Sequence, residues 1–227
     1  MAGPSTHGLF ARLKAAAADD WRAYVEHDFV RALADGTLAE ASFRHYLEQD
    51  YLFLIQFARA YSLAAYKADD LAGMRAATAI ADGLLNVEMR LHVDYCAGWG
   101  VSAAALEALP EATATIAYTR YVLDRGQSGD LLDLMAALAP CVVGYGEIGA
   151  RLAADPATKR DGNPYLPWIE MYSGADYGPV AEAAVAELNR LGEQRATGPR
   201  MPALVRTFRT ATRLEAGFWQ MGLDRAM

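Results

Sequence analysis

The recurrence of apolar side chains at three- and four-residue spacings restricts the fold of this chain more than any other feature of its sequence. It begins with Leu9 and Phe10 and continues through Leu13, Ala17 and Trp21. This spacing places the apolar side chains on one face of a helix. No segment alternates apolar and polar residues as a half-buried strand does, and no repeat of fixed length occurs. We therefore expect an all-α fold of about seven helices around one core, with a ligand site between helices.

The same pattern sets the expected order of the helices along the chain. The helices are predicted over residues 9 to about 30, 43–68, 74–97, 112–124, 131–153, 179–191 and 203–221, with short pieces within 98–110 and at 168–174. Glycine-containing segments at 35–36, 69–73 and 126–130 supply turns. Because no segment resembles a linker, residues 1–227 are predicted to form one domain, with residues 1–8 as a frayed start.

Composition excludes several classes of function. The formal net charge is −7 and lysine and arginine do not cluster, so we expect no nucleic-acid surface. We find no apolar run of about eighteen residues and no signal sequence, and we expect a cytoplasmic protein without a membrane segment. The cysteines, Cys96 and Cys141, lie far apart and outside any Cys-x-x-Cys pair, which predicts reduced thiols and neither a disulfide nor a zinc site.

Pro140 and Cys141 lie inside what the pattern predicts to be a long apolar helix. A proline there removes one backbone hydrogen bond, so the helix is expected to kink or open near the thiol. The glycines at 144, 146 and 149 allow other groups to approach the backbone closely. Cys141 and Tyr145 are four residues apart and share a helix face. The segment is therefore either a pocket wall with a functional thiol or a core helix in which Cys141 is a small buried hydrophobe.

Two carboxylates share helix faces with aromatic side chains. Asp50 lies three residues before Phe53 on the predicted helix 43–68, and Glu215 lies three residues before Phe218 on the predicted helix 203–221. An acid on an apolar face needs a partner, so each is either a site residue or an ordinary exposed acid.

Glu88 and His92 are four residues apart and suggest a metal site. A carboxylate-bridged di-iron site needs Glu-x-x-His segments on two helices, but the four histidines all lie at or before residue 92. We therefore predict no metal site and interpret the pair as a hydrogen bond at the surface or in support of a site residue.

Five ordered segments together resemble the TenA/thiaminase II family along nearly the whole chain. They are Phe43–Phe53, Ala117–Thr119, Leu138–Gly149, Trp168–Gly174 and Glu215–Trp219. The resemblance implies a haem-oxygenase-like helical bundle that uses no haem or other cofactor and assembles as a homotetramer. It implies hydrolysis of thiamin, or deamination of 4-amino-5-aminomethyl-2-methylpyrimidine to the hydroxymethyl form. The sequence leaves the choice between these two substrates open.

The resemblance also assigns roles to individual residues. Cys141 matches the nucleophile, Glu215 the acid/base, and Asp50 the group that binds the aminopyrimidine. The residues that match the lining of the substrate pocket are aromatic: Phe53, Tyr118, Tyr145, Tyr172 and Phe218. Many members have a tyrosine at Phe53 and a bulkier residue at Gly146, so we expect a missing hydroxyl and an enlarged pocket.

Two other functions remain open at this point. One is a different reaction on the same scaffold, by an oxidase or a di-iron oxygenase. The other is a non-catalytic pyrimidine-binding or regulatory protein.

Overall fold

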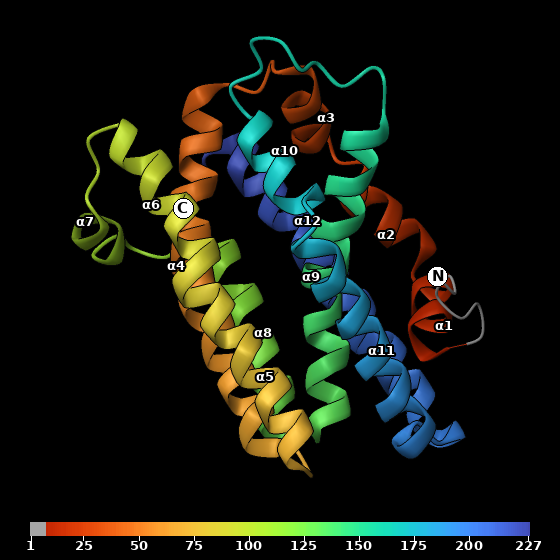
Figure 1. Cartoon of the computed structure of the whole chain (residues 1–227). Coiled ribbons are helices and arrows are strands. Elements are labelled where there is room, and N and C mark those ends of the chain that lie inside the picture. The colour runs from red at the N-terminus through yellow and green to blue at the C-terminus, as the bar shows by residue number, and fades with distance from the viewer. Residues whose placement is uncertain (1–7) are drawn as a thin grey trace. The chain divides into compact units, whose positions relative to one another are not determined.

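The computed structural model describes residues 8–227, and every regular element in that range is a helix (Figure 1). The predicted all-α class is confirmed. Contacts group the chain into two compact units: Met1–Leu38 with Met135–Trp219, and Ala39–Leu134 with Gln220–Met227. Of the terminal residues predicted to be frayed, 1–7 lie outside the described part, whereas Gly8 precedes the first helix in extended conformation.

The first unit begins with three short helices where the sequence predicted one. They are α1 (Leu9–Ala16), α2 (Ala18–Val25) and α3 (Asp28–Asp35). The backbone leaves the helical region at Ala17, with φ −112° and ψ 22°, and again at Glu26. The Phe29 N–H then donates to His27 Nδ1 at 3.2 Å, which caps α3. The apolar spacing continues across both breaks, so the sequence pattern alone does not show where these helices end.

The remaining helices of the first unit follow the predicted order. They are most of α9 (Leu131–Ala154), then α10 (Leu166–Ser173), α11 (Tyr177–Arg195), the short 3-10 turn η2 (Gly198–Arg200) and most of α12 (Met201–Asp224). α11 packs against both α1 and α10. The Phe10 N–H at the start of α1 donates to Asn189 Oδ1 of α11 at 2.9 Å, which joins these helices.

Helix α9 runs through Pro140 without a break in helical conformation. Its glycines provide the close approaches that the sequence predicted. A Cβ at Gly144 would overlap the ring of Tyr24, and one at Gly149 would lie 2.5 Å from the backbone carbonyl of Tyr172. Gly146 differs from expectation, because a Cβ there would lie 3.0 Å from the Cβ of Ala181. The space beside Gly146 is occupied by α11, so the predicted pocket enlargement at this residue is wrong.

Helix α9 also contains an apolar stretch of the length that the sequence analysis did not find. An 18-residue window of this helix has a mean hydropathy of 1.5, and by length and composition it is apolar enough to cross a membrane. However, 78% of that window is buried inside the protein, as in the core helix of a globular fold. The apolar residues of α9 are therefore already covered by protein.

Helix α4 (Glu40–Lys67) is the centre of the second unit. It packs against α5 (Leu71–Gly83), the π-helical turn η1 (Leu84–Glu88), α6 (Met89–Gly98), α7 (Ala103–Glu107) and α8 (Thr113–Ser128), as can be followed in Figure 1. The predicted helix 74–97 corresponds to α5, η1 and α6, which follow one another without a turn. Gly126, a predicted turn residue, lies inside α8, where an added Cβ would be 2.8 Å from Leu63 of α4.

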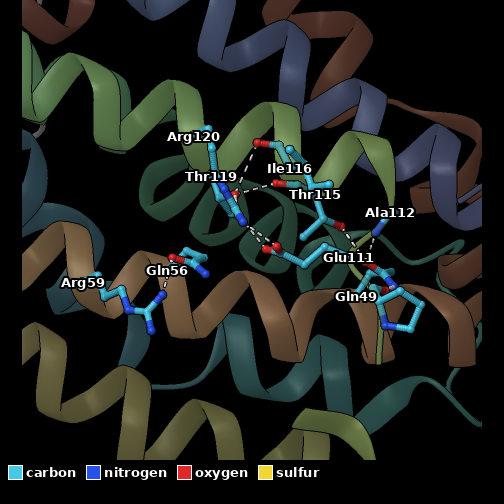
Figure 2. Close-up of polar contacts among 10 residues, drawn as sticks. Gln49, Gln56, Arg59, Glu111, Ala112, Thr115, Ile116, Thr119 and Arg120 are labelled. Carbon is cyan, nitrogen blue, oxygen red and sulfur yellow. Dashed lines mark hydrogen bonds and ion pairs between the residues drawn. The ribbon is translucent and has the colours of Figure 1, made fainter. Parts of the chain in front are cut away.

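The beginning of α8 is held by a side chain of α4, as Figure 2 shows. Gln49 donates from Nε2 to the carbonyl of Pro110 at 3.0 Å. Its Oε1 accepts from the Ala112 N–H and from the Thr115 hydroxyl, both at 2.8 Å. Ala112 is the N-cap of α8 and has no capping side chain of its own, so Gln49 supplies the missing acceptor. This fixes α8 along α4.

Candidate functional site

The residues predicted to form the site are distributed over both units. The first unit contains Cys141, Tyr145, Tyr172, Glu215 and Phe218, and the second contains Asp50, Phe53 and Tyr118.

In the first unit, α9 places Cys141 and Tyr145 one turn apart. Cys141 is partly exposed, whereas Tyr145 is buried. The ring of Tyr145 lies 4.9 Å from that of Tyr172 on α10 and 5.2 Å from that of Trp219 on α12. Trp168 adds a fourth ring, 4.6 Å from Tyr172. A partly accessible thiol thus lies one helical turn from a cluster of packed aromatic rings.

Helix α12 contributes the second carboxylate. Glu215 is only 2% exposed, and Phe218 and Trp219 on the following turn are buried as well. A carboxylate at this depth is held by polar partners rather than by water. Glu215 is therefore a buried acid of the first unit, not an exposed acid on its surface.

In the second unit, Asp50 is 3% exposed and has partners on two helices. The Tyr46 hydroxyl, one turn earlier on α4, donates to Asp50 Oδ2 at 3.0 Å. His92 Nε2 on α6 lies 2.7 Å from the same oxygen. The prediction that this carboxylate needs a partner is confirmed.

For Glu88 and His92 the sequence left open a hydrogen bond at the surface or one in support of a site residue, and the structure shows the second, although through the backbone carbonyl of Glu88. The His92 side chain is fully buried, so it makes no surface hydrogen bond. Its Nδ1 lies 3.0 Å from the backbone carbonyl of Glu88. Burial lowers the pKa of His92, but the hydrogen bond and charge of Asp50 outweigh it and raise that pKa above its ordinary value of 6.5. The available signal was a histidine among apolar neighbours, which does not by itself identify its partner.

Phe53 and Tyr118 are brought together in the second unit. Their ring centroids are 5.0 Å apart, and Phe53 also stacks on Phe57 at 5.0 Å. Both residues of the pair are buried, so α4 and α8 present a continuous aromatic surface here.

The two thiols differ in character. Cys96 on α6 is fully buried, and burial, with a smaller effect of Glu48, raises its pKa to about 11. A thiol with such a pKa is almost wholly protonated near neutral pH and is a poor nucleophile. Cys141 is the partly exposed cysteine and is the better candidate. Within residues 8–227, no three His, Cys, Asp or Glu side chains gather as a metal site would require.

A surface hollow of about 370 Å³ lies between α3 and the end of α9, and it contains none of the predicted residues. Its arginines already have partners: Arg31 bonds Asp28 at 2.8 Å, and Arg151 lies 3.6 Å from Glu26. The hollow therefore adds no support to the predicted site.

Comparison with known proteins finds similar chains over nearly the whole length. A family model described as the TENA/THI-4/PQQC family matches residues 14–225. A protein of Halalkalibacterium halodurans named aminopyrimidine aminohydrolase is 38% identical over 208 residues, which cover 91% of this chain and 92% of that protein.

Solved structures agree with the fold. A protein from a Silicibacter species, described as a TenA family transcription regulator, is 48% identical with a TM-score of 0.89, covering 94% of this chain and 96% of that one. A domain from Shewanella denitrificans described as having a haem-oxygenase-like fold is 16% identical with a TM-score of 0.72, covering 95% and 92%. The predicted haem-oxygenase-like helical bundle is confirmed.

Proposed function

Because the chain belongs to the TENA/THI-4/PQQC family, we propose that it is a hydrolase of thiamin metabolism that acts on aminopyrimidines. The observation that carries this proposal is its similarity, over nearly the full length of both chains, to a relative named aminopyrimidine aminohydrolase. Its substrates are thiamin, 4-amino-5-aminomethyl-2-methylpyrimidine, or both.

In the proposed reaction Cys141 is the nucleophile. Its thiolate adds to the pyrimidine ring and forms a C–S bond, which breaks the aromaticity of the ring. The electron pair of the ring amino group then expels the amine or thiazole from the exocyclic methylene carbon. Water adds to that carbon, forming the C–O bond, and the thiolate leaves to restore the ring. The net change is replacement of the leaving group by hydroxyl, with the thiol regenerated.

Two carboxylates serve this chemistry. Glu215 transfers protons at the ring nitrogen as the thiolate adds and leaves, and its burial on α12 beside Phe218 supports this role. Asp50 accepts a hydrogen bond from the exocyclic amino group. The rings of Phe53, Tyr118, Tyr145, Tyr172 and Phe218 bind the faces of the flat pyrimidine by offset stacking.

We also propose a cytoplasmic homotetramer that binds neither nucleic acid nor membrane. Apolar side chains exposed on the second unit support burial against further copies of the chain. Tyr66 is 84% exposed and Val87 66%, and Leu71 and Leu85 are exposed as well. The net charge of −7 supports the absence of a nucleic-acid surface.

The test is hydrolysis by the purified protein, with products followed by chromatography. We expect turnover of thiamin or of the aminomethylpyrimidine, and the ratio of the two kcat/KM values identifies the preferred substrate. Cys141→Ala should abolish turnover, and Glu215→Gln should lower kcat by about 10² to 10⁴. Cys96→Ala is the matched control and should retain activity. Wild-type turnover in the Cys141→Ala variant would rule out the mechanism.

One observation favours a second candidate, a regulatory protein without catalytic activity. The 48% identical Silicibacter protein is described as a transcription regulator. Gel-shift binding to DNA that weakens steeply with salt, in a protein without hydrolase activity, would favour this candidate.

A further inference from the structure

The two oxygens of Asp50 have different surroundings. The Tyr46 hydroxyl and His92 Nε2 both contact Oδ2, at 3.0 and 2.7 Å. No residue within 8–227 donates a hydrogen bond to Oδ1. A carboxylate oxygen carries lone pairs for two donors, so Oδ2 is saturated while Oδ1 retains its full accepting capacity. The Asp50 side chain as a whole is only 3% exposed, so bulk water has little access to this carboxylate.

The contacts of His92 fix where its protons lie. Nδ1 faces the carbonyl oxygen of Glu88 at 3.0 Å, and a carbonyl can only accept. Nδ1 therefore carries a proton, and the remaining proton of the pair lies between Nε2 and Asp50 Oδ2. Among the described groups, the titratable ones that act on His92 are Asp50 from α4 and Glu88 from η1. Both are acidic and raise the pKa of His92, which favours the protonated imidazole.

The backbone around His92 carries a second unusual feature. The turn Leu84–Glu88 that precedes α6 is π-helical. Such turns are rare, and they occur frequently at functional sites. Here the last residue of the turn, Glu88, supplies the carbonyl that orients the imidazole. The π turn therefore ends on the residue whose carbonyl contacts the ring of His92.

We propose that His92 is a positioning residue that, with Tyr46, holds Oδ2 of Asp50 so that Oδ1 stays available to the exocyclic amino group of an aminopyrimidine. This inference rests on the proposed function. His92 acts through Asp50 and forms no bond with the substrate. Removing it leaves a buried carboxylate that is less well oriented, which should weaken substrate binding more than it slows the bond-breaking steps.

A double-mutant cycle tests this role. Binding of 4-amino-5-hydroxymethyl-2-methylpyrimidine, the proposed product, is measured by calorimetry, together with kcat and KM for the substrate that the wild type hydrolyses. His92→Ala should raise the dissociation constant and KM about tenfold to a hundredfold, with a smaller change in kcat. His92→Gln, which keeps a donor near the position of Nε2, should recover part of the loss. In an Asp50→Asn background, His92→Ala should have little further effect.

His45→Gln is the matched control, because His45 Nε2 on α4 lies 3.0 Å from the carbonyl of Ala226 in an exposed contact, and the variant should bind the pyrimidine as wild type does. Equal losses from His92→Ala in both backgrounds overturn the positioning role and indicate a structural one. If His92→Ala does not fold, Tyr46→Phe removes the other donor to Oδ2 and is tested in the same cycle. A wild type that neither binds nor hydrolyses aminopyrimidines overturns the proposed function itself, whereas an active wild type with independent effects overturns only the role of His92.

Discussion

Substituting alanine for Gly149 tests how closely α9 must approach α10. A Cβ at this position would lie 2.5 Å from the carbonyl carbon and oxygen of Tyr172 and 2.8 Å from the nitrogen of Ser173. Ordinary contacts begin near 3.4 Å, so the deficit is about 0.9 Å. The obstructing atoms are backbone atoms, which cannot rotate away as a side chain would. The two helices must therefore separate.

The magnitude follows from two opposing effects. Overpacking costs about 1–3 kcal/mol, and the contact with backbone places Gly149→Ala in the upper part of that range. Replacing glycine by alanine within a helix contributes about 0.5–1 kcal/mol of stability. The net loss should be about 1–2 kcal/mol, which lowers Tm by about 2–8 °C for a chain of this length. Because the Tyr172 ring contacts Tyr145 at 4.9 Å, KM for the aminopyrimidine should also rise.

The assay compares thermal and urea unfolding of Gly149→Ala with those of Gly217→Ala. Gly217 lies within α12, and a Cβ there would meet no atom within 4 Å. The same substitution should therefore stabilise the protein by about 0.5–1 kcal/mol at residue 217. Opposite signs at the two positions are the expected result. If both variants gain stability equally, the close approach of α9 and α10 is not a constraint and the reasoning fails.

Three further predictions concern other parts of the molecule. The difference in free energy of unfolding between wild type and His92→Gln should be greatest below pH 6.5 and should shrink as pH rises through the raised pKa of His92. The reason is that the protonated imidazole is paired only in the folded state. Urea titrations at several pH values measure this difference, and a difference that grows with pH would contradict the pairing. Gln49→Ala should cost about 1–3 kcal/mol in urea unfolding because three polar groups at the start of α8 lose their partner. Gln56→Ala removes an exposed hydrogen bond with Arg59 and should be nearly neutral (Figure 2). Iodoacetamide at mildly alkaline pH should modify Cys141 before Cys96, as mass spectrometry of digested protein would detect; preferential labelling of Cys96 would refute the difference in thiol character.

The sequence by itself determined the helical class, the longer helices and the family. The predicted helices 43–68, 131–153 and 203–221 match α4, α9 and α12 to within three residues at each end. These segments are long, and their apolar spacing is regular, so local pattern and tertiary packing favour the same structure. The glycines of α9 were also interpreted correctly as points of close approach, because a missing Cβ has few other uses within a helix.

Tertiary structure alone decided the details of the candidate site. The sequence pointed to a partner for Asp50 but could not identify His92, since the two lie 42 residues apart and meet only when α6 packs on α4. The sequence predicted an enlarged pocket beside Gly146, but Ala181 of α11 is packed there. It joined α1, α2 and α3 into one helix. Apolar spacing records which face of a segment is buried, but not which neighbour covers that face or where the backbone turns.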